Sequence, residues 1–62
     1  MTYYGTFEAL PCVFNDTKAF VLYDPAEGWR QDNLAEVRQI ASLMTEQQFH
    51  ATYPWLPEVP LS

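Results

Sequence analysis

Apolar residues recur at helical spacing in one stretch of the chain, Asn33–Met44. Its apolar stripe, at intervals of three and four positions, consists of Leu34, Val37, Ile40, Ala41 and Met44. This spacing predicts an amphipathic helix with one face against a core. Asn33 can cap the first turn, and Glu36, three residues later, has the spacing of a capping box. We expect the rest of the chain to cover this stripe.

The N-terminal part has a different pattern, in which residues 2–10 are rich in aromatic and β-branched side chains. That content predicts a strand. Gly5 interrupts it and indicates a bulge or a close backbone approach. Pro11 lacks an N–H group, so we expect it at an edge, a bend or a bulge.

Two apolar runs flank a short polar segment and predict a β-hairpin. The runs are Cys12–Phe14 and Ala19–Tyr23, and the polar segment Asn15–Lys18 has the residues of a turn. Ala19–Tyr23 is almost continuously apolar, which favours burial on both faces or a central place in the sheet.

Turn and cap signals divide the second half of the chain. Asp24–Glu27, followed at once by Gly28, predicts a single helical turn or a loop. Thr45–Gln48 has capping-box spacing and predicts a short second helix over Glu46–Thr52, which Pro54 stops. Prolines 54, 57 and 60 predict an extended tail that packs on the body or docks a partner.

These elements predict one small α+β domain over residues 1–62. Residues 1–23 would form an antiparallel sheet of two or three strands, and residues 24–53 the helical part. In that part the main helix covers one face of the sheet and a short second helix follows. Residues 54–62 would form the Pro-rich tail. A sheet this small cannot bury its apolar face alone, and the helix stripe is its natural complement.

Charge narrows the function classes. Eight acidic residues face three basic ones, for a net charge of −5. Lys18, Arg30 and Arg38 are too few and too scattered to replace counterions along phosphates, which argues against direct nucleic-acid binding. An acidic surface favours basic partners, and nucleic-acid-binding proteins are the largest class of these. The plainer alternative is that the charge only keeps a small protein soluble.

Candidate chemistry is sparse. The one thiol, Cys12, lies in an apolar run, where cysteine is usually buried and inert, and the one imidazole, His50, lies on a short amphipathic segment. One Cys and one His do not make a zinc site, and the glycines are too few for a phosphate loop. We predict no enzyme, no metal and no cofactor. The chain has no signal-peptide pattern, no membrane-length apolar run and no second cysteine, so we expect a cytoplasmic protein.

Acidic and aromatic residues are the best candidates for partner binding. The acids that lie close in sequence are Asp24, Glu27, Asp32 and Glu36. An early helix start would place Asp32 and Glu36 on one face, where their repulsion brings no stability. Trp29, Tyr53 and Trp55 are the candidate apolar anchors, although most aromatics must be core. Four further acids could extend the row: Glu8, Asp16, Glu46 and Glu58.

The sequence-based hypothesis is therefore a small acidic, non-enzymatic inhibitor that occupies the basic nucleic-acid-binding surface of a partner protein. Small phage or mobile-element anti-defence proteins, including CRISPR inhibitors, are similar in size and charge, and the analogy goes no further. The alternative is a structural or assembly module that completes its core by homodimerisation or in a larger complex.

Overall fold

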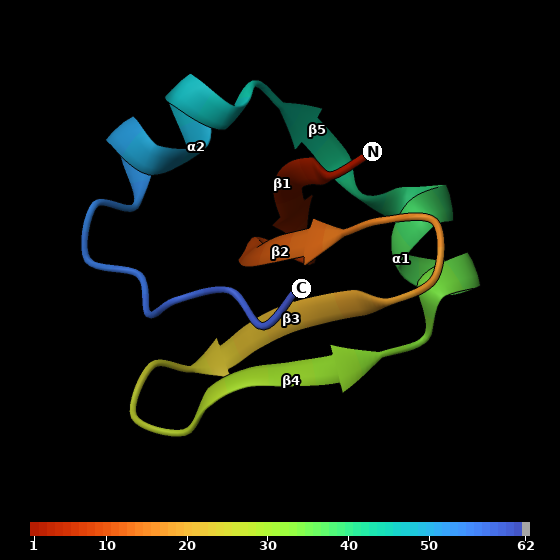
Figure 1. Cartoon of the computed structure of the whole chain (residues 1–62), viewed down its shortest axis with the longest axis horizontal. Helices are drawn as coiled ribbons and strands as arrows, with labels where there is room; N and C mark the ends of the chain where they lie inside the picture. The colour runs from red at the N-terminus through yellow and green to blue at the C-terminus, as the bar shows by residue number, and fades with distance from the viewer. Residues whose placement is uncertain (62) are drawn as a thin grey trace.

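The computed structural model describes residues 1–61 and has one antiparallel sheet with two short helices (Figure 1). The elements are β1 (Tyr3–Phe7), β2 (Leu10–Phe14), β3 (Ala19–Asp24), β4 (Gly28–Asp32), α1 (Leu34–Ile40), β5 (Ser42–Met44) and α2 (Glu46–Thr52). The five strands have the order β4-β3-β2-β1-β5. The α+β class is thus confirmed, but the sheet is larger than the predicted two or three strands.

The predicted strand over residues 2–10 is confirmed as far as Phe7, where a tight turn ends it. β1 and β2 pair from Phe7↔Leu10 to Tyr3↔Phe14, and Glu8 and Ala9 form the connection. Both connecting residues have positive φ, 51° and 69°. Such turns usually carry Asn or Gly, so the sequence has no turn signal here.

Two strands lie in the part predicted to be helical. β4 returns along β3 after the Asp24–Glu27 turn, with Val21 opposite Arg30. β5 pairs with β1, with Gly5 opposite Leu43. A Cβ on Gly5 would lie 2.1 Å from the Ser42 carbonyl oxygen, so the predicted close backbone approach is confirmed.

α1 is shorter than predicted, because Ala41 is already extended (ψ 139°) and β5 follows. Asn33 caps α1 as predicted, its side chain accepting a hydrogen bond from the Glu36 N–H at 3.0 Å. The predicted stripe holds only in part. Val37 is fully buried, whereas Ile40 is 50% exposed and Met44 lies on β5.

The sheet is covered on both faces. On one face, Val37 packs into a cluster with Phe7, Cys12, Phe14, Ala19 and Val21. On the other, α2 contributes the fully buried Phe49, whose ring lies 5.2 Å from that of Tyr4. The predicted hairpin is confirmed as β2–β3, and Ala19–Leu22 are buried on both faces. Pro11 lies opposite Thr6 in β2, at the point where pairing with β3 has not yet begun.

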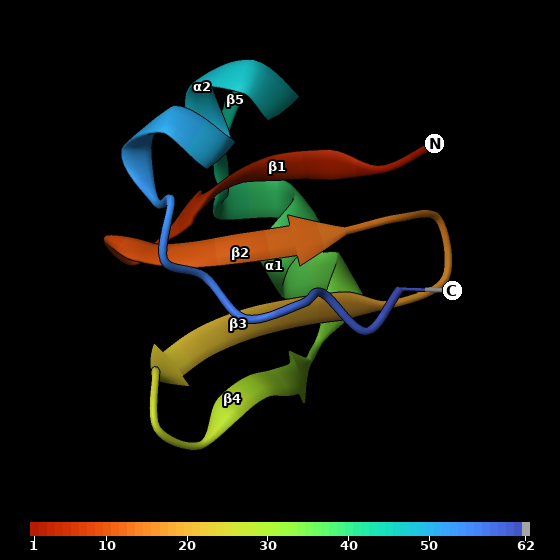
Figure 2. The ribbon, with the colours of Figure 1, turned by 60° about the vertical axis from the view of Figure 1, so that its left-hand side comes forward.

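α2 has the predicted bounds and the predicted capping box, in which Thr45 and Gln48 exchange hydrogen bonds of 3.0 and 3.3 Å. The tail after Tyr53 crosses in front of β2 and β3 in Figure 2, with α1 behind the sheet. The Trp29 Nε1–H donates to the Pro57 carbonyl oxygen at 3.0 Å, so the tail packs on the body. Residue 62 of the predicted tail lies outside the described residues. Within residues 1–61 neither helix has the length and apolar character needed to cross a membrane.

Candidate functional site

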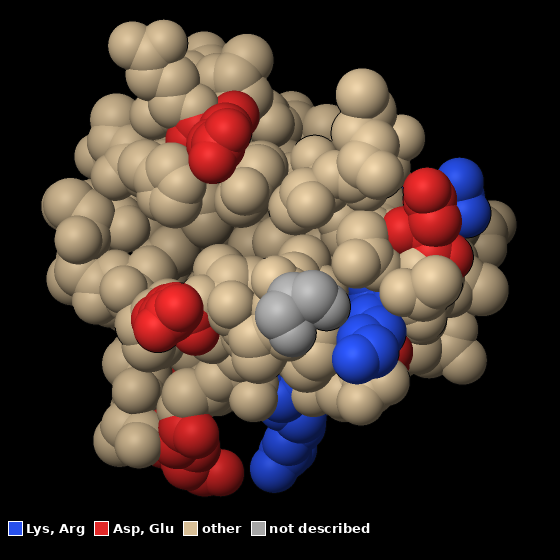
Figure 3. Space-filling view, in the orientation of Figure 1, with Lys and Arg blue, Asp and Glu red and all other residues tan. Residues whose placement is uncertain are grey.

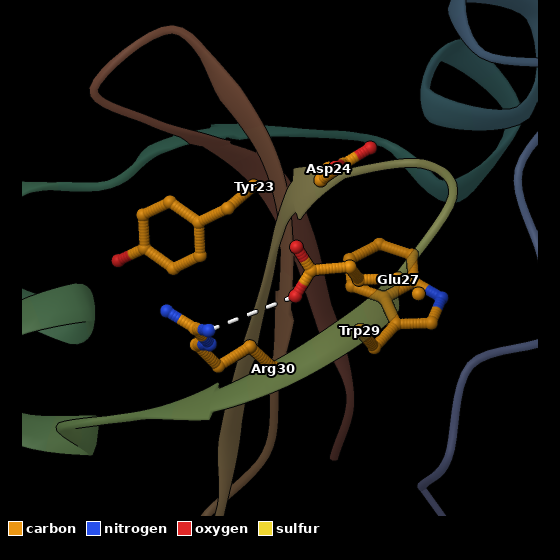
Figure 4. A pocket seen from close by; sticks show the side chains of 6 residues that line it. Tyr23, Asp24, Glu27, Trp29 and Arg30 are labelled. Carbon is orange, nitrogen blue, oxygen red and sulfur yellow. Dashed lines mark ion pairs between the residues drawn. The ribbon is translucent and has the colours of Figure 1, made fainter.

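The β3–β4 turn borders a shallow hollow of about 230 Å³ (Figure 4). It is lined by Tyr23, Asp24, Glu27, Gly28, Trp29 and Arg30. The Asp24 carboxylate accepts from the Ala26 N–H at 3.0 Å and so stabilises the turn. Gly28 has φ 83°, which favours glycine. The sequence-based expectation of a single turn or loop at this point is confirmed. The hollow is smaller than typical small-molecule sites, which begin at about 300 Å³.

Arg30 is the basic residue of this region. Its guanidinium lies 3.8 Å from a Glu27 carboxylate oxygen and 5.8 Å from the Tyr23 ring centre. The dashed line in Figure 4 marks the ion pair with Glu27. Both charged side chains are about two-thirds exposed, 68% and 67%. An exposed ion pair of this kind contributes under about 1 kcal/mol to the stability of the fold. Either side chain can therefore leave this pair and bind another charged group.

Three carboxylates from different elements of the fold raise the pKa of one phenol, that of Tyr23. Tyr23 donates a hydrogen bond to Asp32, and this bond, with burial and the negative charges of Asp32, Glu8 and Glu36, raises the pKa of Tyr23 to about 12. Glu8 comes from the β1–β2 turn, Asp32 from the end of β4 and Glu36 from α1. We call these four residues, Tyr23 with Glu8, Asp32 and Glu36, the acidic surface.

Two of the predicted acids, Asp32 and Glu36, therefore both act on the Tyr23 phenol, although they do not lie on one helix. Asp32 is on β4 and Asn33 is the N-cap, so the two carboxylates do not share a helix face. The Asp32 carboxylate also accepts from the Asn33 N–H at 2.7 Å. Sequence reasoning ranks Glu8 below these residues and misses Tyr23, because it does not predict that β4 pairs with β3 and so brings Asp32 within reach of the Tyr23 hydroxyl.

Asp16 and Glu46 have partners outside the acidic surface, whereas Asp24 and Glu27 line the hollow beside Tyr23. Asp16 is 3.6 Å from the N-terminal amine, and Glu46 accepts from the Tyr4 hydroxyl at 3.3 Å. The side that carries the tail shows carboxylates separated by uncharged surface or by basic side chains (Figure 3). The acids of the chain thus do not form one continuous row.

Tyr53 and Trp55 lie on the α2 and tail side, away from the acidic surface. Their rings are 6.1 Å apart in an edge-to-face contact, and Trp55 is 56% exposed. Tyr53 also contacts Phe49 at 5.4 Å. Tyr53 borders a second hollow, of about 440 Å³, between α2 and the tail. Trp29 points to this same side through its bond to Pro57. The predicted acids and anchors therefore do not make a single surface. Asp24, Glu27 and Trp29 line the first hollow, whereas Tyr53 borders the second.

Cys12 and His50 do not come together as a nucleophile and base. Cys12 is fully buried in the α1-side cluster, and burial raises the pKa of its thiol to about 11. His50 is on α2, on the opposite face, with its Nε2 3.7 Å from a Glu46 carboxylate oxygen. A protonated thiol is a poor nucleophile and metal ligand. In the described part of the chain, no group of three or more His, Cys, Asp or Glu is placed to hold a metal ion.

Comparison with known proteins adds no information on function. No protein-family model, no curated protein and no solved structure matches this chain.

Proposed function

We propose that this chain is a small non-enzymatic binding protein whose acidic surface engages a basic surface of a partner protein. The observation that supports this most is the convergence of Glu8, Asp32 and Glu36 on Tyr23 from three separate elements. All three negative charges act on the same phenol, and like charges repel. A cationic partner would relieve that repulsion, adding its charge to that of Arg30, whose guanidinium already lies over the Tyr23 ring.

The finer form of the proposal is an inhibitor that acts in the cytoplasm. It would occupy the groove in which a nucleic-acid-binding protein holds phosphates. Small anti-defence proteins of phages, including CRISPR inhibitors, are similar to this chain in size and charge, and the analogy rests on these two properties alone. The net charge of −5 supports a basic partner and opposes direct contact with DNA or RNA. The predicted anchors Trp29, Tyr53 and Trp55 contribute less to this surface, because they lie on the α2 and tail side.

The alternative, an assembly module that completes its core with a second copy, has less support. Val37 and Phe49 are both fully buried within a single chain and cover the two faces of the sheet. A core that needed completion would leave one of these faces open.

An arginine-rich peptide is a suitable probe, because the proposal specifies the partner's charge and not its fold. We expect the chain to bind this peptide with an affinity that falls steeply with salt, measured by calorimetry. The triple variant Glu8→Gln, Asp32→Asn, Glu36→Gln should bind at least about tenfold more weakly, a loss of about 1.4 kcal/mol.

The control is a second triple variant with the same change of net charge, Asp16→Asn, Glu46→Gln, Glu58→Gln. It should keep most of the affinity. Equal losses in both variants would mean that only net charge matters, and the acidic surface would have no specific role.

A further inference from the structure

The sheet has an open edge at β4. β4 is the last strand in the sheet order, and Figures 1 and 2 both show no other helix or strand of residues 1–61 beyond it. An edge strand presents unpaired N–H and C=O groups that another strand can join. The opposite edge, β5, is three residues long and uncharged, whereas β4 is five residues long and carries charges.

Opposite charges lie two positions apart on one face of β4. Arg30 lies over the Tyr23 ring, and Tyr23 donates to Asp32, so both charged side chains are on the Tyr23 side. Trp29, between β4 and the tail, points to the other side. This is the alternation expected of a strand.

We propose that β4 pairs antiparallel with β4 of a second copy of this chain, in the register centred on Gln31. In that register Arg30 of each copy faces Asp32 of the other. The two copies are related by a two-fold axis at Gln31, so the dimer contains two such pairs. Directly opposed charges of unlike sign stabilise a sheet, and like charges destabilise it. A register centred on Arg30 would set two guanidinium groups against each other. The spacing of Arg30 and Asp32 therefore favours β4 of a second copy as the pairing strand, and it favours the register centred on Gln31.

Pairing in this way costs Arg30 little. Its bond to Glu27 is long, 3.8 Å, and exposed, so the guanidinium can turn toward the second copy. Two chains of net charge −5 also repel each other, and one strand buries a small area. We therefore expect a weak dimer that forms in the high micromolar range. This inference does not depend on the proposed function.

Sedimentation of the full chain, from micromolar concentration to about 1 mM, tests the dimer. Arg30→Asp and Asp32→Arg should each weaken self-association about tenfold or more, because both facing pairs become repulsive. Arg38→Asp and Glu58→Arg make the same charge changes away from β4 and should weaken it much less. Circular dichroism verifies that each variant is folded. If a charge-reversed variant does not fold, the neutral variants Arg30→Gln and Asp32→Asn replace it.

Mixing the two charge-reversed variants tests the pairing itself. Each alone should be monomeric, and their mixture should form a one-to-one dimer, since acidic positions on one chain then face basic positions on the other. Both variants keep a net negative charge, which excludes simple attraction between opposite chains. Gln31→Cys should also cross-link to itself on mild oxidation, while Gln39→Cys on α1 should not.

Three results would overturn the proposal. The natural chain could remain monomeric at about 1 mM. The dimer could persist undiminished in Arg30→Asp and Asp32→Arg. The mixture of these two variants could associate no better than either alone.

Discussion

Gly5 shows how one missing side chain determines the position of a strand. Its Cβ would lie 2.1 Å from the Ser42 carbonyl oxygen, a distance that real Cβ atoms do not adopt. The blocking atom is backbone, so no side chain can rotate away. β5 can join the sheet only because position 5 has no side chain.

Gly5→Ala should therefore displace β5 and destabilise the fold by about 1–3 kcal/mol, as overpacking does. Hydrogen exchange measured by NMR should show lost amide protection in Ser42–Met44. Gly28→Ala is the matched control, because space is open there and the cost comes from its φ of 83° alone. Gly28→Ala should leave the amides of β5 protected. An equal loss of amide protection in Ser42–Met44 in both variants would contradict this explanation.

Tyr23 gives the chain a pH dependence at the alkaline end. Its pKa is raised from 10.0 to about 12, first by the hydrogen bond to Asp32 and then by burial and nearby carboxylates. A raised pKa in the folded state means that the neutral phenol stabilises the fold. That stability is complete below pH 10 and is lost as the pH rises from 10 toward about 12.

Absorbance titration of the phenols should resolve a group near 12 that disappears in Tyr23→Phe and falls in Asp32→Asn. The thermal midpoint of the natural chain should drop more steeply above pH 10 than that of Tyr23→Phe. Parallel pH profiles for these two proteins would mean that the bond to Asp32 does not exist in solution.

At the scale of the element, α1 packs through fewer residues than its apolar pattern predicts. Val37 is fully buried and Ile40 is 50% exposed, since the helix ends at Ile40 and the chain turns into β5. Ile40 lies at the end of the helix, where the stripe no longer faces the sheet.

Val37→Ala should consequently cost about 2–3 kcal/mol in urea unfolding, through lost burial and the cavity left behind. Ile40→Ala removes more atoms but should cost under about 1 kcal/mol, because exposed positions tolerate change. If Ile40→Ala were the more harmful of the two, the helix would extend as the sequence pattern predicted.

The sequence predicted those elements whose signals are local. The capping box of Thr45 and Gln48 and the Asn15–Lys18 turn are carried by side chains that bond to nearby backbone, and both are confirmed. β4 and β5 depend instead on pairing with distant strands, which a local pattern does not encode. The turn at Glu8 and Ala9 was missed because neither residue is typical of positive φ.

In the candidate site, too, the sequence predicts only what depends on residues close together in the chain. The closeness of Asp32 and Glu36 in sequence identifies them, and both charges act on Tyr23. Glu8 joins them only through the β1–β2 turn, and Tyr23 only through the β3–β4 pairing. Tyr53 and Trp55 were grouped with the acids, but the tail carries them to the other face of the sheet.

At the scale of the whole molecule, the sheet separates two chemically different sides. The α1 side holds the acidic surface, and the other holds α2, the aromatic residues Tyr53 and Trp55, and the tail. A basic partner should recognise the first side and leave the second free. The proposed β4 dimer would set two acidic surfaces next to each other along one extended sheet.

Mapping the bound peptide by NMR tests the central claim most directly. The labelled chain would be titrated with an arginine-rich peptide while its amide shifts are followed. We predict that the largest changes lie at Glu8, Tyr23, Asp32 and Glu36, and that they vanish at high salt. Changes centred on Tyr53 and Trp55, or spread evenly over all the acids, would contradict the account.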